Sequence, residues 1–117
     1  MRAEDFDIVV ERAFRKIPRR FRRRLSNLMM VVEREPPRGA NLLGLYQGNN
    51  AFALPDKITI YQGPHERLAR NVAHLETLVE ETVWHEVAHY FGMDEAQVCH
   101  AEFRRRMLTL QNRPVIR

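Results

Sequence analysis

Apolar residues recur every three or four positions near the start of the chain. This spacing is carried by Phe6, Val9, Val10, Ala13, Phe14 and Ile17. It places them on one face of a helix, so we predict an amphipathic helix over residues 4–16. Pro18 then interrupts the pattern, and proline suits the first turn of a new helix. A second, short helix is therefore predicted over Pro18–Ser26.

The middle of the chain shows short apolar runs bounded by turn residues, a pattern typical of strands. Leu28–Glu33 contains β-branched residues and is interpreted as a buried strand. Leu42–Gln47 is predicted as a second strand, in which Gly44 indicates a bulge or a close approach by another backbone. Lys57–Tyr61 alternates and is predicted as a third strand, which can pair antiparallel with the second.

Helical spacing returns in the second half of the chain. A short helix is predicted over His65–Arg70, and a long helix over Val72–Phe91. Asn71 can cap the start of the long helix. Gly92 stops the helical pattern where a C-terminal glycine would.

A last helix is predicted from Glu95 to about Leu110, because Asp94 and Gln97 have the spacing of a capping box. With 117 residues, the chain is expected to form a single domain spanning residues 1–117. An apolar fraction of 44% and a charged fraction of 29% are typical of a soluble globular protein.

Composition also bears on where the protein works. No apolar run approaches the ~20 residues of a membrane span, and the first residues lack the apolar core of a signal peptide. We therefore expect a cytoplasmic protein that does not contact a membrane. Cys99 is the only cysteine, which excludes an internal disulfide and a zinc site built from cysteines alone.

The long predicted helix carries the sequence His85-Glu86-Val87-Ala88-His89, which reads HExxH. Residues four apart lie on one helix face, so the two imidazoles can point at one ion. Zinc accepts neutral imidazole nitrogens, and a catalytic zinc keeps three protein ligands and one position for water. Glu86 can reach that water. The alternative is an ordinary amphipathic helix whose histidines are core or surface groups.

The motif continues through Gly92 to Glu95, so that the whole reads HExxHxxGxxE. Together with Leu42–Gly48 and with Ile58–Tyr61 ahead of a Gly-Pro pair, it resembles the small bacterial zincin-like metallopeptidase family. The resemblance implies an α+β fold with a small three- to four-stranded sheet packed on helices and the motif on a long central helix. It also implies a zinc site and peptidase activity, but no particular substrate.

The third zinc ligand is where the sequence departs from this family. Its members typically carry aspartate at the position of Glu95, and here an aspartate stands one residue earlier, at Asp94. We favour Glu95, because it has the family's spacing and because Asp94 is expected to cap the last helix. A glutamate carboxylate is an accepted zinc ligand. The predicted metal set is therefore His85, His89 and Glu95.

These residues predict a zinc-dependent peptidase acting on peptides or proteins. Glu86 is expected to act as general base on a zinc-activated water and to return the proton to the leaving amine. An edge strand, with Leu42–Gln47 as the candidate, can hold an extended peptide by main-chain pairing. The alternative is a non-catalytic zinc-binding or interaction domain. The sequence predicts neither the substrate nor the oligomeric state.

The net charge is +4, and the cationic residues are clustered. The first cluster contains Arg12, Arg15, Lys16, Arg19, Arg20, Arg22, Arg23 and Arg24, and the second contains Arg104, Arg105 and Arg106. Such clusters attract nucleic acid or acidic partners. No aromatic-rich binding motif accompanies the arginines in sequence, so we interpret them as a solvated helix face. A basic binder of nucleic acid or of acidic partners is the second alternative.

Other polar and aromatic residues are assigned ordinary structural roles. Four side chains could donate to a developing oxyanion, namely Tyr46, Tyr61, Tyr90 and His100. Packing is the expected role of each. His65 and His74 lack ligand spacing and are expected at the surface, whereas Trp84 and Phe91 are expected in the core.

Overall fold

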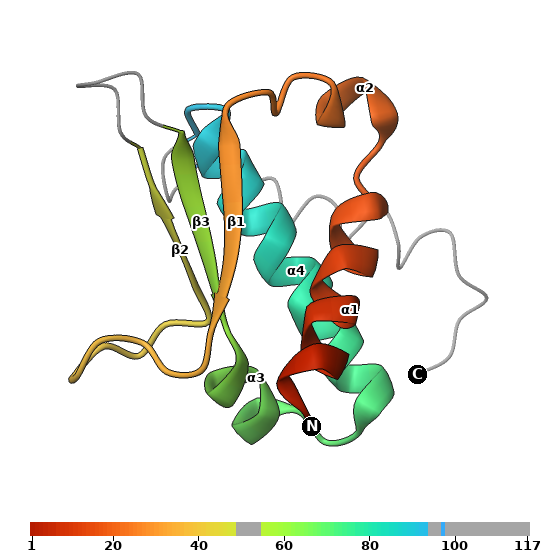
Figure 1. Ribbon diagram of the computed structural model, residues 1–117, viewed down its shortest axis with the longest axis vertical. Coiled ribbons are helices and arrows are strands. Elements are labelled where there is room, and N and C mark those ends of the chain that lie inside the picture. The colour runs from red at the N-terminus through yellow and green to blue at the C-terminus, as the bar shows by residue number, and fades with distance from the viewer. Residues whose placement is uncertain (49–54, 94–96, 98–117) are drawn as a thin grey trace.

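The computed structural model of the chain describes residues 1–48, 55–93 and 97. In this part of the chain, a three-stranded sheet lies against two long helices (Figure 1). In chain order the elements are α1 (Ala3–Arg15), α2 (Arg19–Arg22), β1 (Leu28–Glu33), β2 (Gly44–Gln47), β3 (Asp56–Tyr61), α3 (Gln62–Leu68) and α4 (Val72–Tyr90). The α+β class expected from the sequence is confirmed.

The sheet is mixed, with the strand order β1-β3-β2. β1 pairs parallel with β3, in the register that sets Leu28 beside Asp56. β2 pairs antiparallel with β3, in the register that sets Gly44 beside Ile60. The expected antiparallel pairing of the second and third strands is therefore confirmed, and β2 is an edge strand of the described sheet.

The core lies between the sheet and the helices α1 and α4. Its buried apolar members are Phe6, Val9, Val10, Ala13, Ile17, Leu25, Ile58, Ile60, Leu75, Val79, Val83 and Val87. On α4, the last four of these are spaced by four residues and so form one stripe along the helix. Full burial of such a side chain contributes roughly 1.5–3 kcal/mol, so this stripe fixes which way α4 faces.

Both ends of α4 are closed as the sequence indicates. The Asn71 side chain accepts a hydrogen bond of 2.8 Å from the backbone N–H of His74. At the other end Gly92 has a φ of +90°, a conformation that favours glycine. Its N–H donates to the carbonyl of His89 at 2.9 Å, and the N–H of Met93 donates to the carbonyl of Ala88 at 3.1 Å. This pair of bonds is a Schellman motif.

Two strand predictions need correction. Leu28–Glu33 is not a buried strand: β1 lies at an edge of the described sheet, and Met29 is 47% exposed. The buried strand is β3, because it has a neighbour on each side. The second strand begins at Gly44, two residues later than expected, although the Leu43 carbonyl still accepts from the Tyr61 N–H at 3.0 Å.

Two of the short helices also differ from expectation. α2 is only four residues long, and the chain then tightens into bonds between residues three apart, such as Arg24 N–H to the Phe21 carbonyl at 2.9 Å. Five arginines crowded into the six residues 19–24 repel one another in a regular helix. α3 starts at Gln62, three residues earlier than expected. The expected last helix lies outside the described residues, apart from Gln97.

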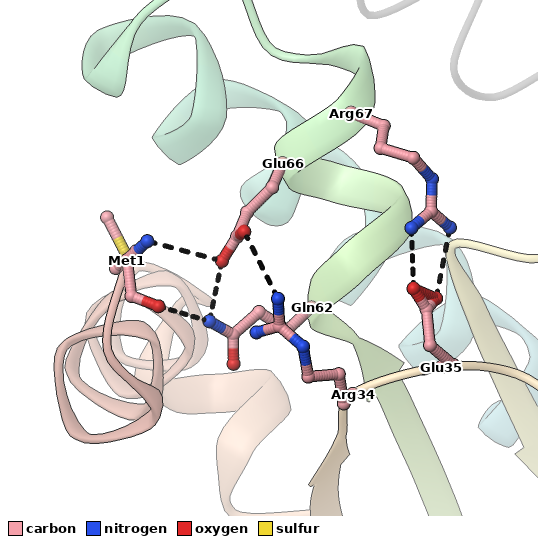
Figure 2. A network of polar contacts seen from close by, with 6 residues as sticks. All are labelled: Met1, Arg34, Glu35, Gln62, Glu66 and Arg67. Carbon is pink, nitrogen blue, oxygen red and sulfur yellow. Dashed lines mark hydrogen bonds and ion pairs between the residues drawn. The ribbon is translucent and has the colours of Figure 1, made fainter.

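A network of charged and polar groups joins α3 to the end of β1 (Figure 2). The Arg67 guanidinium donates to both oxygens of the Glu35 carboxylate, at 2.5 and 3.0 Å. The Glu66 carboxylate accepts from Gln62 at 2.6 Å and lies 4.0 Å from the Arg34 guanidinium. Every group in this network therefore has an oppositely charged or polar partner.

Among the described residues, no helix combines the length and the apolar character needed to cross a membrane.

Candidate functional site

A cleft of about 550 Å³ lies between β2 and the C-terminal half of α4. One wall is formed by residues 41–46, which are β2 and the segment leading into it. The other wall is formed by α4 side chains, namely Leu78, Glu81, Thr82, His85, Glu86 and His89. The structure therefore brings the two histidines and the glutamate of the motif into one open cleft beside an edge strand.

The two motif histidines lie next to each other, one helical turn apart. Their ring centroids are 5.0 Å apart, and the ring planes are inclined by 67°. Both side chains are partly buried. Because the apolar stripe of α4 faces the core, the adjacent face of the helix carries both imidazoles into the cleft.

The end of α4 fixes how the second histidine is oriented. The ring nitrogen Nδ1 of His89 lies 2.8 Å from the carbonyl oxygen of Met93. A carbonyl oxygen can only accept, so Nδ1 carries a proton, and in the neutral ring Nε2 carries the lone pair. Met93 is in place because the chain turns back through Gly92. The glycine therefore does more than end the helix: it sets the tautomer of His89.

Glu86 is the most buried of the motif's three polar side chains, with 6% of its surface exposed. It packs beneath β2 at Gly44. A Cβ atom at position 44 would lie 2.7 Å from Thr82 Cγ2 and 3.2 Å from Glu86 Cγ. Separations of this size leave no room for a side chain, which explains the glycine within the strand. The sequence predicts a bulge or a close approach by another backbone at this glycine. The nearest atoms are instead those of α4 side chains, with the backbone oxygen of Thr59 at 3.2 Å.

His65 is fully buried, so its assignment to the surface is wrong. Its Nδ1 donates to the Tyr61 carbonyl at 2.6 Å, and its Nε2 lies 2.8 Å from the Thr82 hydroxyl. Burial lowers the pKa of the His65 imidazole, and the bond to the Tyr61 carbonyl opposes this shift. The neutral ring can accept at Nε2 from Thr82, but the single hydroxyl proton of Thr82 is shared with the Leu78 carbonyl, which lies 2.9 Å away. Thr82 also lines the cleft.

Of the residues considered as oxyanion donors, only Tyr46 lines the cleft within the described part of the chain. Its hydroxyl donates to the Asp56 carboxylate at 2.5 Å. Burial, followed by this bond, raises the pKa of Tyr46 to about 12. Tyr61 is buried in the core, at 3% exposure, and the Tyr90 hydroxyl donates to the Arg24 carbonyl at 3.4 Å. His100 lies outside the described residues.

The remaining predicted site residue, Glu95, and its competitor Asp94 also lie outside the described residues. Within residues 1–48, 55–93 and 97, no three His, Cys, Asp or Glu side chains are grouped so as to hold a metal ion. Thr82, Glu81 and Leu78 were not singled out as cleft residues from the sequence. The available signal was helical spacing: each precedes another cleft residue by four positions, Thr82 before Glu86, Glu81 before His85 and Leu78 before Thr82.

Comparisons with known proteins bear on this arrangement. A family model described as zincin-like metallopeptidase matches residues 25–104. The solved structure of a conserved hypothetical protein from T. thermophilus is similar, with 28% sequence identity and a TM-score of 0.57. That similarity covers 77% of this chain and 94% of the other. No curated protein matches. Since the matched residues include the whole sheet, both walls of the cleft and the motif, the chain belongs to the zincin-like metallopeptidase family.

Proposed function

We propose that this protein is a zinc-dependent peptidase that hydrolyses peptide bonds in the cleft between β2 and α4. In this proposal His85 and His89 are zinc ligands, Glu95 is the third ligand, and Glu86 is the general base. One observation carries the proposal: His85, Glu86 and His89 line a single open cleft beside an edge strand.

The described donors fit zinc. Two imidazoles that share one tetrahedral ion through Zn–N bonds of about 2.0–2.1 Å have ring centroids about 5 Å apart. The observed separation of the two motif rings is 5.0 Å. The bond from His89 Nδ1 to a backbone carbonyl is the outer contact that metal-binding histidines usually make. When bound, zinc makes a water molecule more acidic and polarises a carbonyl group.

Glu86 is suited to move the proton. Glu86 is the residue after His85, one of the proposed ligands. Its side chain packs closely against the backbone of β2 at Gly44. In the proposed reaction its carboxylate accepts a proton from the attacking water and donates it to the leaving amine. A positioned base of this kind contributes typically 10²–10⁴-fold to the rate.

The cleft wall is suited to hold an extended peptide. β2 is an edge strand in the described sheet, so its outer main-chain groups can pair with a peptide as an added strand. Three leucines of residues 41–46 and Leu78 give the cleft an apolar lining. Main-chain pairing then supplies affinity, and the apolar lining supplies contacts to alternate side chains.

The Glu86→Gln variant tests the catalytic role. We expect it to keep its zinc and its melting temperature and to lose about 10²–10⁴-fold in cleavage of unstructured casein. Glu76→Gln is a matched control, because Glu76 lies on the same helix but does not line the cleft. It is expected to retain parental activity. If the zinc-loaded parent cleaves nothing in a broad peptide library, the protein is not a peptidase.

One observation favours a second candidate, a non-catalytic zinc-binding domain. The single proton of the Tyr46 hydroxyl is donated to Asp56. This tyrosine therefore has no donor left for a substrate oxyanion unless that bond breaks. Retention of zinc together with binding, but not cleavage, of extended peptides would support this second candidate.

A further inference from the structure

We propose that a cationic surface beside the cleft binds acidic segments of polypeptides and docks acidic protein substrates. The surface consists of Arg19, Arg20, Arg23 and Arg24 on and after α2, with Phe21 and with Phe91 at the end of α4. Figure 1 shows α2 and the C-terminal end of α4 at the same end of the molecule. Docking of substrates, but not binding itself, rests on the peptidase function proposed above.

The arginines of this surface are exposed, and none forms an ion pair with a carboxylate among the described residues. Elsewhere the protein does pair its charges. Arg15 lies 2.5 Å from Glu11, and Lys16 lies 2.5 Å from Glu80. Four like charges held within six residues create a positive potential that attracts an anionic partner.

Two of the guanidinium groups rest on aromatic rings. The Cζ atom of Arg20 lies 4.9 Å from the centroid of the Phe21 ring, and that of Arg24 lies 5.7 Å from the Phe91 ring. The two phenylalanine rings are themselves 6.2 Å apart. Stacking holds a guanidinium plane in place while its N–H donors remain available at the edge, so less freedom is lost on binding a carboxylate. Phe91 is 37% exposed, so the prediction that it lies in the core is wrong, and its ring lies at the surface.

The same stacking argues against nucleic acid as the partner. Single-stranded nucleic acid is held by bases stacked on open aromatic faces. Here guanidinium groups already lie over the rings of Phe21 and Phe91. The N–H edges of these guanidinium groups remain available, and they suit carboxylates better than they suit bases.

The position of the surface connects it to the cleft. The Tyr90 ring lies 5.5 Å from the Phe91 ring and 6.3 Å from the ring of Tyr46, which lines the cleft. An extended polypeptide advances about 3.3–3.6 Å per residue. The two ring distances, with the 5.7 Å from the Phe91 ring to Arg24, bound the path from Tyr46 to Arg24, and roughly five extended residues span it.

The test is a binding measurement that needs no catalysis. A fluorescent peptide ending in six glutamates and the same peptide ending in six glutamines are titrated with the zinc-loaded Glu86→Gln protein. The proposal expects the glutamate peptide to bind more tightly, with an affinity that falls as salt is raised. Equal affinity for the two peptides would overturn it, and so would tighter binding of an oligothymidylate than of the glutamate peptide.

A charge-matched pair of variants separates a local surface from net charge. Arg20→Gln with Arg24→Gln should weaken binding of the glutamate peptide about tenfold. Arg38→Gln with Arg70→Gln removes the same charge from exposed arginines elsewhere and should leave binding within about twofold. Equal losses in the two double variants would overturn the proposal.

Kinetics with cleavable peptides then distinguish the docking proposal from the peptidase proposal. In the parent, an acidic tail should lower KM and leave kcat unchanged, and the Arg20→Gln, Arg24→Gln variant should abolish this difference. Cleavage without any preference for the acidic tail overturns docking but leaves the peptidase function intact. Binding to the arginines without cleavage upholds the surface and overturns the peptidase function.

Discussion

Two histidines in this protein make the same local contact and lie in opposite surroundings. His65 donates from Nδ1 to the carbonyl of Tyr61, four residues earlier, at 2.6 Å. His89 donates from Nδ1 to the carbonyl of Met93, four residues later, at 2.8 Å. His65 is fully buried and its Nε2 meets the Thr82 hydroxyl, whereas His89 is partly buried and lines the open cleft with His85.

The difference shows that one kind of backbone contact to an imidazole can serve two different purposes. In both cases the contact settles which nitrogen carries the proton, and so where the lone pair points. At His65 the lone pair points inward and completes the packing of α3 against α4. At His89 the same kind of hydrogen bond orients Nε2 in the cleft. Substitutions at His65 should therefore change stability, and substitutions around His89 should change metal affinity.

The largest effect on stability is expected for His65→Ala. It removes a fully buried ring and leaves both the Tyr61 carbonyl and the Thr82 hydroxyl without that partner. The combined loss of packing and hydrogen bonding should lower the free energy of unfolding by about 2–4 kcal/mol. Urea denaturation measures this loss, and zinc content at low temperature should stay at the parental level. Loss of zinc from the folded variant would break the contrast between the two histidines.

Gly92→Ala is expected to act on the metal through His89. A side chain at a φ of +90° costs roughly 1–2 kcal/mol, and relief of the strain displaces the Met93 carbonyl. Loss of such an outer contact lowers metal affinity about 10–100-fold. The measurement is a zinc competition titration with a chelator.

Gly39→Ala is the matched control for this variant. Gly39 also has a positive φ, +83°, and no atom of the described residues lies within 4 Å of a Cβ built there, as at Gly92. It lies between β1 and β2, outside the cleft lining. It should lose comparable stability and keep its zinc affinity. Equal zinc affinities in the two variants would show that the Gly92 turn does not orient His89.

A smaller effect is expected from pH. Burial holds the pKa of His65 below the value of about 6.5 that the unfolded chain has. Below that pH the unfolded state takes up a proton that the folded state does not, so stability is complete above about pH 6.5 and falls as the pH drops toward the folded pKa. The fall is at most about 1.4 kcal/mol per pH unit for one group.

His65→Gln should remove this part of the pH dependence. Urea denaturation of both proteins between pH 7.5 and 5 measures it. An identical pH profile for the variant and the parent would mean that His65 does not titrate in this way. Glu35 and Glu66 also contribute, but in a more acidic range, because arginine pairing for Glu35 and the Gln62 hydrogen bond for Glu66 lower the pKa of each carboxyl.

Much of the fold follows from local patterns in the sequence. The spacing of apolar residues predicts α1 and α4, and Asn71 and Gly92 mark the ends of α4 because caps depend on neighbouring residues alone. β3 and its antiparallel partner are also predicted. The burial of His65 is not, because it depends on Thr82, a partner 17 residues away on another helix.

The candidate site is divided in the same way. Helical spacing is enough to set His85 beside His89, and their roles as ligands stay a prediction, as does the role of Glu95. The sequence does not predict that aromatic rings lie beneath the arginines of the cationic surface. Phe21 and Phe91 are far apart in the sequence, and only the packing of α2 against the end of α4 brings them together.

Zinc content tests the central claim most directly, namely that the cleft histidines hold a metal ion. The protein is purified without an affinity tag, and its zinc per chain is measured beside His89→Ala and His74→Ala. His74 lies on the same helix, and its Nδ1 accepts from the Arg70 N–H at 3.0 Å, outside the cleft lining. We expect about one zinc per chain in the parent and in His74→Ala, and loss of most of it in His89→Ala. Equal zinc content in the parent and His89→Ala, or none in the parent after incubation with zinc, would contradict the account.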